Sequence, residues 1–223
     1  MSPPPRLVRL VNPNAGTAAT ERMVAAARAA APEWLSVEGY TTAASPVLIV
    51  DESGSAQAEA AVVAAAGRDF GSEHGIIVSA YIDPGIAAIR ARLSVPVVGI
   101  GESSMRAAAA IGRFAIAMTT PGLVAMVRRY ADRLGLADRL VAVPSTTGDP
   151  HVLMADPDRV LAALDDLVRR AVRDHGAEAV IVGGGPLADA ARELAATSPV
   201  PLIEPVPAAV REMSTILARR WGT

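Results

Sequence analysis

The chain has 223 residues, enough for one large domain or two smaller lobes that each bury a core. Hydrophobic residues make up 51% and aromatic residues only 3%, so we expect a core of Ala, Val, Leu and Ile. The net charge of −2 gives no general attraction to nucleic acid or membrane surfaces. Every basic residue is Arg, and Cys is absent. Lysine Schiff bases, thiolate catalysis, disulfides and Cys-ligated metals are therefore excluded.

The N-terminal stretch MSPPPRLVRLV lacks the pattern of a signal peptide. The uncharged runs farther along are too short, and too rich in Thr, Gly and Pro, to span a bilayer. We expect a cytoplasmic protein with no membrane or nucleic-acid partner.

Short apolar runs alternate with Ala-rich amphipathic segments along the chain, a pattern typical of α/β layers with a largely parallel sheet. Strands are predicted at Leu7–Val11, Val47–Val50, Gly75–Ala80, Val95–Ile100, Phe114–Met118, Leu140–Val143, Ala179–Val182 and Pro201–Ile203. Helices are predicted at Thr20–Ala31, Ala56–Ala66, Leu123–Leu134, Pro157–His175 and Leu187–Ala196.

The sequence also contains an internal repeat. HGIIVSAYIDPGIAAIRARLSVPVVGIGESSMRAA and AEAVIVGGGPLADAARELAATSPVPLIEPVPAAV share an apolar strand, a Gly/Pro turn, an Ala-rich helix and a second strand. This match sets Ala80 opposite Gly184, and the upstream segments set Asn12 and Pro13 opposite Thr119 and Thr120. Shared α/β patterning alone would give some likeness, but the repeated order favours duplication.

Duplication predicts two similar Rossmann-like lobes related by a pseudo-two-fold axis, each with a mostly parallel sheet flanked by helices. We place one lobe at 1–99 plus 208–223 and the other at 100–207. Ligands of such sheets bind where the carboxyl ends of the strands converge, so we expect an active-site cleft between the lobes.

Five segments in order, VNPNAGT, SAYIDPGIAAIR, VPVVGIGESSM, RFAIAMTTP and VIVGGGPLADAARELA, resemble the Asp/Glu/hydantoin racemase family. The resemblance runs from about Leu7 to Val210. It implies a cofactor-independent enzyme in which two cysteines, one from each lobe, move a proton on opposite faces of a carbon acid. The positions that match these cysteines hold Ala80 and Gly184.

Neither a methyl group nor a hydrogen can take a proton from carbon, so the two-thiol mechanism is excluded here. The turn GGGPL also differs from the family turn at several positions, which indicates a naturally cysteine-free branch. Such a branch has either altered chemistry or a binding role alone.

The resemblance also implies residues that bind the substrate. Asn12 matches an amide that holds a carboxylate or imide, although Asn-Pro-Asn is also good turn chemistry. Thr119 and Thr120 match an anion-anchoring pair, and helix capping is the alternative. Thr42 is a further candidate for binding the substrate, and Thr41 and Ser45 are candidates for a similar contribution.

The turn after the predicted strand at Ala179–Val182 holds Gly183, Gly184, Gly185 and Pro186. Glycines permit close approach of the backbone to a ligand, and Pro186 would begin the next helix with free N–H groups. A tight structural turn explains the same residues. The spacing does not match a dinucleotide fingerprint.

Ser79 and Tyr81 flank Ala80 and are predicted to line the cleft, while Asp83 in DPG reads as a turn and helix-cap residue. Glu102, placed at the end of a strand, is the best carboxylate base, with a salt-bridged hinge role as the alternative. His151 lies in a loop and is expected to be solvated. No spacing of His, Asp and Glu predicts a metal site.

Three functions follow. The first is a cysteine-independent enzyme for a small carboxylate or cyclic imide or amide, with isomerase, decarboxylase or hydrolase chemistry. The second is a non-catalytic protein that binds a small anion. The third is a hydantoin or amino-acid racemase by similarity only. We expect no cofactor, and homo-oligomer formation stays open.

Overall fold

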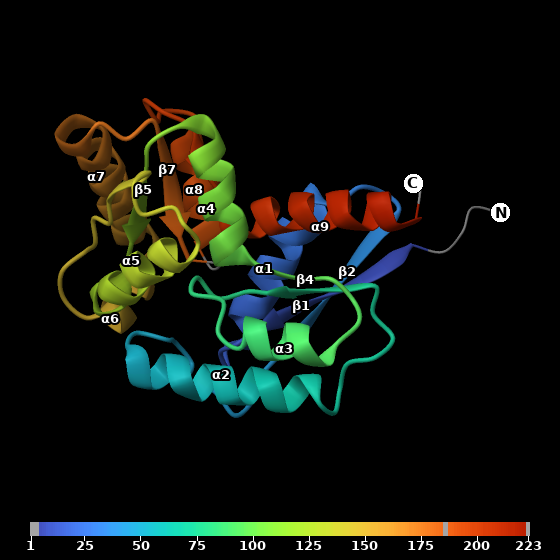
Figure 1. The fold of residues 1–223 in the computed structure, drawn as a ribbon. Coiled ribbons are helices and arrows are strands. Elements are labelled where there is room, and N and C mark those ends of the chain that lie inside the picture. Colours follow the sequence, from blue (N-terminus) through green and yellow to red (C-terminus); the bar gives the residue numbers. More distant parts are fainter. Residues whose placement is uncertain (1–4, 185–186, 222–223) are drawn as a thin grey trace.

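The computed structural model describes residues 5–184 and 187–221 and contains two four-stranded parallel sheets (Figure 1). The first has the order β2-β1-β3-β4 and the second β6-β5-β7-β8. This confirms the α/β class with two similar lobes. Short strands that lack polar alternation, such as AVIVG in β7, are buried over their whole length, as expected of sheets covered on both faces.

The first sheet lies between two helical layers. One layer packs on Val8 and Leu10 and consists of α1 and α9, whereas the other packs on Val11 and Ile76 and consists of α2 and α3 (Figure 1). The elements are β1 (Arg6–Asn12), α1 (Thr17–Ala30), β2 (Leu35–Thr41), α2 (Glu52–Ala66), β3 (Gly75–Val78), α3 (Ile86–Arg92), β4 (Val97–Gly99) and α9 (Pro205–Trp221).

The second sheet is covered by α7 and α8 on one face and by α4 and α5 on the other. Its elements are α4 (Ile100–Ile111), β5 (Phe114–Met118), the 3-10 turn η1 (Pro121–Leu123), α5 (Val124–Arg133), β6 (Leu140–Ala142), α6 (Pro150–Met154), α7 (Pro157–His175), β7 (Ala179–Gly183), α8 (Ala188–Ala195) and β8 (Leu202–Ile203). Among the described helices, none is both long and apolar enough to cross a membrane.

The helix after the fourth strand of each sheet crosses to the other lobe. α4 follows β4 but packs on β7 and β8, while α9 follows β8 and packs on β3 and β4. This reciprocal exchange joins the lobes, and α4 and α9 also contact each other. The lobe boundaries at 99/100 and 207/208 stay a prediction.

The strand predicted at Val47–Val50 is wrong. The sheet position is taken by β2, where buried Leu35 and Val37 alternate with exposed Glu38, a short period-two signal. The apolar run that follows forms an irregular loop instead. Its Ile49 packs with Tyr81 and Met118 in a core cluster that spans both lobes.

Candidate active site

A small cavity of about 70 Å³ lies between the lobes, where the carboxyl ends of β1, β3, β5 and β7 converge. This position fits the rule for ligand sites of open parallel sheets. We call it the interlobe cavity. Its lining residues are Asn14, Leu48, Ile49, Ser79, Ala80, Tyr81, Ile82, Met118, Thr119, Thr120, Leu123, Met154, Gly183, Gly184 and Leu187.

Seven of the predicted site residues meet in this cavity: Ser79, Ala80, Tyr81, Thr119, Thr120, Gly183 and Gly184. Gly185 and Pro186 lie outside the described residues. Asn12, Thr42 and Glu102 do not line the interlobe cavity.

Asn12 supports the turn after β1 from within. It is fully buried, and its Nδ2 donates to Asn14 Oδ1 at 3.0 Å, Gly16 O at 3.1 Å and Thr20 Oγ1 at 2.9 Å. Its Oδ1 accepts from Asn14 N at 3.1 Å. Because both ends of the amide are used, Asn12 orients Asn14, and Asn14 reaches the interlobe cavity.

The strand registers explain this correction. Val8 pairs with Gly75 in the first sheet, and Phe114 pairs with Ala179 in the second. With Ala80 opposite Gly184, these pairs make Val8 equivalent to Phe114. Asn14 then falls opposite Thr120, so setting Asn12 and Pro13 opposite Thr119 and Thr120 was wrong.

Thr42 also has a structural partner. Its hydroxyl donates to Asn12 O at 3.0 Å and shares a 2.8 Å hydrogen bond with Ser45 Oγ. Thr42 therefore fastens the end of β2 to the end of β1 rather than facing the interlobe cavity.

Thr119 and Thr120 do not cap the helix that follows them. Thr120 precedes η1 but makes no side-chain cap hydrogen bond. Within the described part of the chain, the Thr119 hydroxyl has only a 3.8 Å contact with Met154 Sδ. Both hydroxyls thus remain candidates for ligand contact at the end of β5.

Gly183 and Gly184 are constrained by space and by backbone geometry. A Cβ on Gly183 would lie 2.9 Å from Ile116 Cγ2, and Gly184 has φ +151°, where an L side chain is strained. The glycines thus close the turn against β5, and Gly184 leaves the second lobe without a reactive side chain.

Ser79 and Tyr81 differ in their surroundings. The Ser79 hydroxyl contacts Met23 Sδ at 3.0 Å, which ties it to α1. The buried Tyr81 hydroxyl has no hydrogen-bond partner among the described residues. Burial raises the pKa of Tyr81 above its usual value, so the phenol stays protonated.

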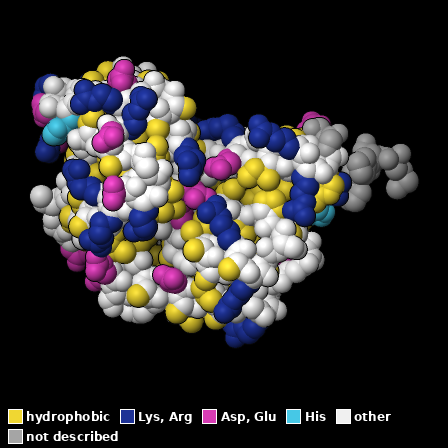
Figure 2. Space-filling model, in the orientation of Figure 1, with side chains coloured by type: hydrophobic (Ala, Val, Ile, Leu, Met, Phe, Trp, Pro, Cys, Tyr) yellow, Lys and Arg dark blue, Asp and Glu magenta, His cyan; other side chains and the backbone are white. Residues whose placement is uncertain are grey.

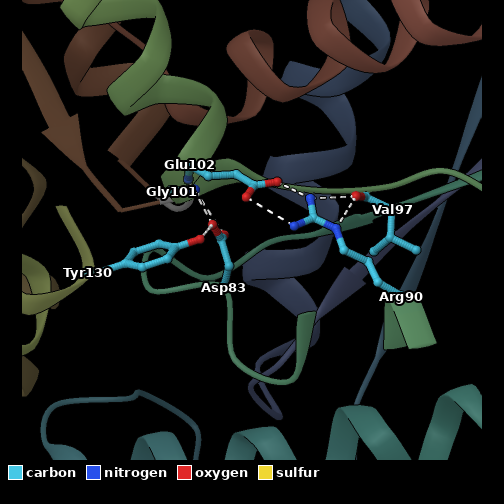
Figure 3. Close-up of polar contacts among 6 residues, drawn as sticks. All are labelled: Asp83, Arg90, Val97, Gly101, Glu102 and Tyr130. Carbon is cyan, nitrogen blue, oxygen red and sulfur yellow. Dashed lines mark hydrogen bonds and ion pairs between the residues drawn. The ribbon is translucent and has the colours of Figure 1, made fainter. Parts of the chain in front are cut away.

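Glu102 lies in the first turn of α4, not at a strand end as predicted (Figure 3). Its carboxylate pairs with Arg90, which also donates from Nε to Val97 O at 2.9 Å. Glu102 is therefore salt-bridged, and its side chain lines a groove together with Ile82 and Asp83. The hinge role stays a prediction.

Asp83 is buried beside this ion pair and accepts three hydrogen bonds (Figure 3). The prediction that Asp83 caps the helix after its turn is wrong, because α3 has Gly85 at its N-cap and no side-chain cap hydrogen bond. Asp83 accepts instead from the first amides of α4. His151 is exposed at the start of α6 and does not line the interlobe cavity.

Sequence reasoning missed one polar residue and the apolar wall of the interlobe cavity. The missed residues are Asn14, Leu48, Ile49, Ile82, Met118, Leu123, Met154 and Leu187. The run at 47–50 was visible, but it was interpreted as a strand. Within residues 5–184 and 187–221, no group of three His, Asp or Glu side chains could hold a metal ion.

Comparison with known proteins places the chain in a family. Residues 8–213 match the family described as Asp/Glu/Hydantoin racemase, so the chain belongs to the Asp/Glu/hydantoin racemase family. It is 27% identical to a hydantoin racemase of Pseudomonas sp. (strain NS671) over 214 residues, 94% of this chain and 85% of that protein.

Solved structures show the same fold. An allantoin racemase from Klebsiella pneumoniae superposes with a TM-score of 0.90 at 27% identity, covering 96% of this chain and 89% of that one. Arylmalonate decarboxylase gives a TM-score of 0.62 at 16% identity over 95% and 92% of the two chains, a likeness of fold alone.

Proposed function

We propose that this chain acts on a small carboxylate or cyclic imide bound in the interlobe cavity, by chemistry that uses no thiol. One observation carries the proposal: Ala80 and Gly184, equivalent residues of the two lobes, line a single cavity at the strand ends. The names of the similar racemases point to ring substrates, since hydantoin and allantoin both contain a cyclic imide.

The chemistry of the lining limits the reaction. None of its described residues is Asp, Glu, His or Arg, and the Tyr81 phenol is a poor base because burial raises its pKa. A side chain that removes a proton from carbon is therefore missing. Asn14, Thr119 and Thr120 supply amide and hydroxyl donors for a developing oxyanion.

Among the three reaction types, decarboxylation best fits a lining with no base, and it applies to the carboxylate substrates alone, because hydantoin and allantoin carry no carboxylate. The bond between the α-carbon and a carboxylate breaks, CO₂ leaves, and the electron pair enters an enolate held by the donors. A proton from water then completes the product. Isomerisation and ring hydrolysis each require a base, which water would have to provide.

The second candidate is binding of a small anion without turnover. The same lack of a titratable side chain favours it, because donors without a base recognise an anion but do not activate it. Both candidates place the ligand in the interlobe cavity.

Incubation in D₂O with hydantoins, allantoin, aspartate, glutamate and arylmalonates separates the candidates. Deuterium at the α-carbon, CO₂ release with deuterium in the product, or a ring-opened product that has gained one water supports the enzyme. Binding measured by calorimetry without any of these changes rules out the enzyme and leaves the binding protein. If no compound binds or reacts, both are wrong for these substrates.

Variants locate the activity. Thr119→Val with Thr120→Val removes both hydroxyls at nearly constant volume and is expected to abolish the signal. Thr147→Val, on an exposed loop outside the interlobe cavity, is the matched control and should retain it.

A further inference from the structure

The Asp83 carboxylate follows directly on Ile82, which lines one wall of the interlobe cavity. Figure 3 shows this carboxylate close to Gly101, Glu102 and Tyr130. Asp83 Oδ1 accepts from Gly101 N at 2.9 Å. Its Oδ2 accepts from Glu102 N at 2.8 Å and from the Tyr130 hydroxyl at 2.6 Å. Asp83 follows β3 in the first lobe, while α4 and α5 pack against the second sheet. The carboxylate is therefore a joint between the lobes.

The backbone is shaped around this joint. Asp83 has φ +49°, the only positive φ at a non-glycine residue among those described. A Cβ on Gly99 would overlap the Asp83 carboxyl, and one on Gly101 would overlap Tyr81 O. Left-handed backbone is unfavourable at a residue with a side chain, and it persists only where the surroundings enforce it.

The joint is continuous with the cavity wall. Ile82, the neighbour of Asp83, lines the interlobe cavity on one side and an outer groove of about 360 Å³ on the other. Asp83, Glu102 and Tyr130 line the same groove. A shift at Asp83 must therefore move Tyr81 and Ile82, and with them the wall beside Ala80.

We propose that Asp83 is a positioning residue that locks the cavity wall at residues 79–82 onto the second lobe, so that the interlobe cavity keeps its shape only while the three hydrogen bonds to its carboxylate are intact. This proposal rests on the proposed function only in treating the interlobe cavity as a ligand site; the hydrogen bonds of Asp83 do not depend on it.

The charged groups around Asp83 make the joint sensitive to pH. The pKa of Asp83 is raised to about 7, chiefly by burial and to a smaller extent by the Glu102 carboxylate, against the three donors, which lower it. Arg90, from α3, is engaged by Glu102. A protonated Asp83 cannot accept from all three donors, so the joint should loosen locally as the pH falls below about 7, with the carboxyl still buried. Because the protonated group stays buried, this local loosening does not lower the stability of the whole fold.

The test uses a thiol reporter, because the chain has no cysteine of its own. Ala80→Cys places one thiol on the cavity wall, and Val47→Cys, at a side chain that is 70% exposed, corrects for the ionisation of the thiol. The ratio of their alkylation rates with iodoacetamide measures the opening of the wall and needs no substrate.

We expect this ratio to rise several-fold as the pH falls from 8 to 6. Asp83→Asn should make it high and independent of pH. Tyr130→Phe removes one donor and should move the midpoint to higher pH. The controls are Asp69→Asn and Tyr40→Phe, which break a similar 2.5 Å tyrosine–aspartate hydrogen bond at the surface and should leave the profile unchanged.

A ratio that does not change with pH, or variants at Asp83 and Tyr130 that match the parent, would overturn the proposal. If Asp83→Asn fails to fold, the midpoint of the alkylation ratio in Tyr130→Phe decides whether the proposal holds. Failure of the proposed function gives a different result. In that case no compound of the substrate panel binds or reacts, but the alkylation ratio of the thiol reporter still changes with pH.

Discussion

Ala80 and Gly184 line one cavity from opposite lobes, at equivalent places in two sheets of the same strand order. In the family pattern that the sequence resembles, these places hold the two thiols. Here they hold a methyl group and a hydrogen atom. The two lobes thus face one cavity at these positions with side chains that cannot move a proton.

Gly184 is expected to tolerate no side chain without cost. Its φ of +151° strains any L residue, and a Cβ would lie 3.2 Å from Leu187 Cδ1. Gly184→Ala should lower the free energy of unfolding by at least about 1 kcal/mol in urea denaturation. Gly71→Ala, where nothing lies within 4 Å of the new Cβ, is the control and should be nearly neutral. Equal effects would show that the turn at Gly184 relaxes freely.

Asn12 and Asn14 should separate stability from binding. Asn12→Ala leaves buried partners of the turn without hydrogen bonds and should cost about 1–3 kcal/mol of unfolding free energy. Asn14→Ala should mainly weaken binding of whichever panel compound binds tightest, measured by calorimetry. A loss of binding in Asn12→Ala at unchanged stability would restore Asn12 as a direct ligand contact.

The contrast between these two residues shows how far sequence reasoning reached. Periodicity and the internal repeat predicted both sheets and seven of the residues that line the interlobe cavity. The choice between Asn12 and Asn14 needed the structure, because both are buried at the end of β1 and only Asn14 lines the interlobe cavity.

The hydrogen-bond network around Asp83 and Glu102 was harder to predict from the sequence. Glu102 and Asp83 meet because α4 begins directly after β4. The first backbone amides of α4 therefore reach the loop between β3 and α3, which holds Asp83. No local pattern encodes that contact. Likewise, the run at Val47–Val50 has the pattern of a buried strand, but β2 occupies the edge of the sheet beside β1.

Glu102→Gln tests the remaining carboxylate candidate. The Glu102 side chain is 7% exposed and Arg90 is 43% exposed, so the pair lies between a surface pair and a buried one. Removing the charge should cost about 1–3 kcal/mol in urea denaturation. Glu38→Gln, in the exposed pair with Arg9, should cost less than about 1 kcal/mol. Turnover in the substrate panel should persist in both variants. A folded Glu102→Gln protein that loses turnover would instead identify a catalytic base.

Asp83 should also make global stability depend on pH. Its pKa is about 7 in the fold, whereas an unfolded aspartate titrates near 3.9, as in model peptides. Between these values the folded state binds more protons, so the free energy of unfolding falls as the pH rises from 5.5 to 7, by at most about 1.4 kcal/mol per pH unit. Above pH 7 the effect levels off.

Urea denaturation at pH 5.5, 6.5 and 7.5 measures this slope. Asp83→Asn removes the titrating group and should flatten the profile, whereas Asp69→Asn should keep the slope of the parent. The expected trend is opposite to that of a salt-bridged aspartate, whose contribution grows with pH. Stability that rises across this window would mean that the three donors outweigh burial, so that Asp83 stays ionised in the fold and the joint does not respond to pH near neutrality.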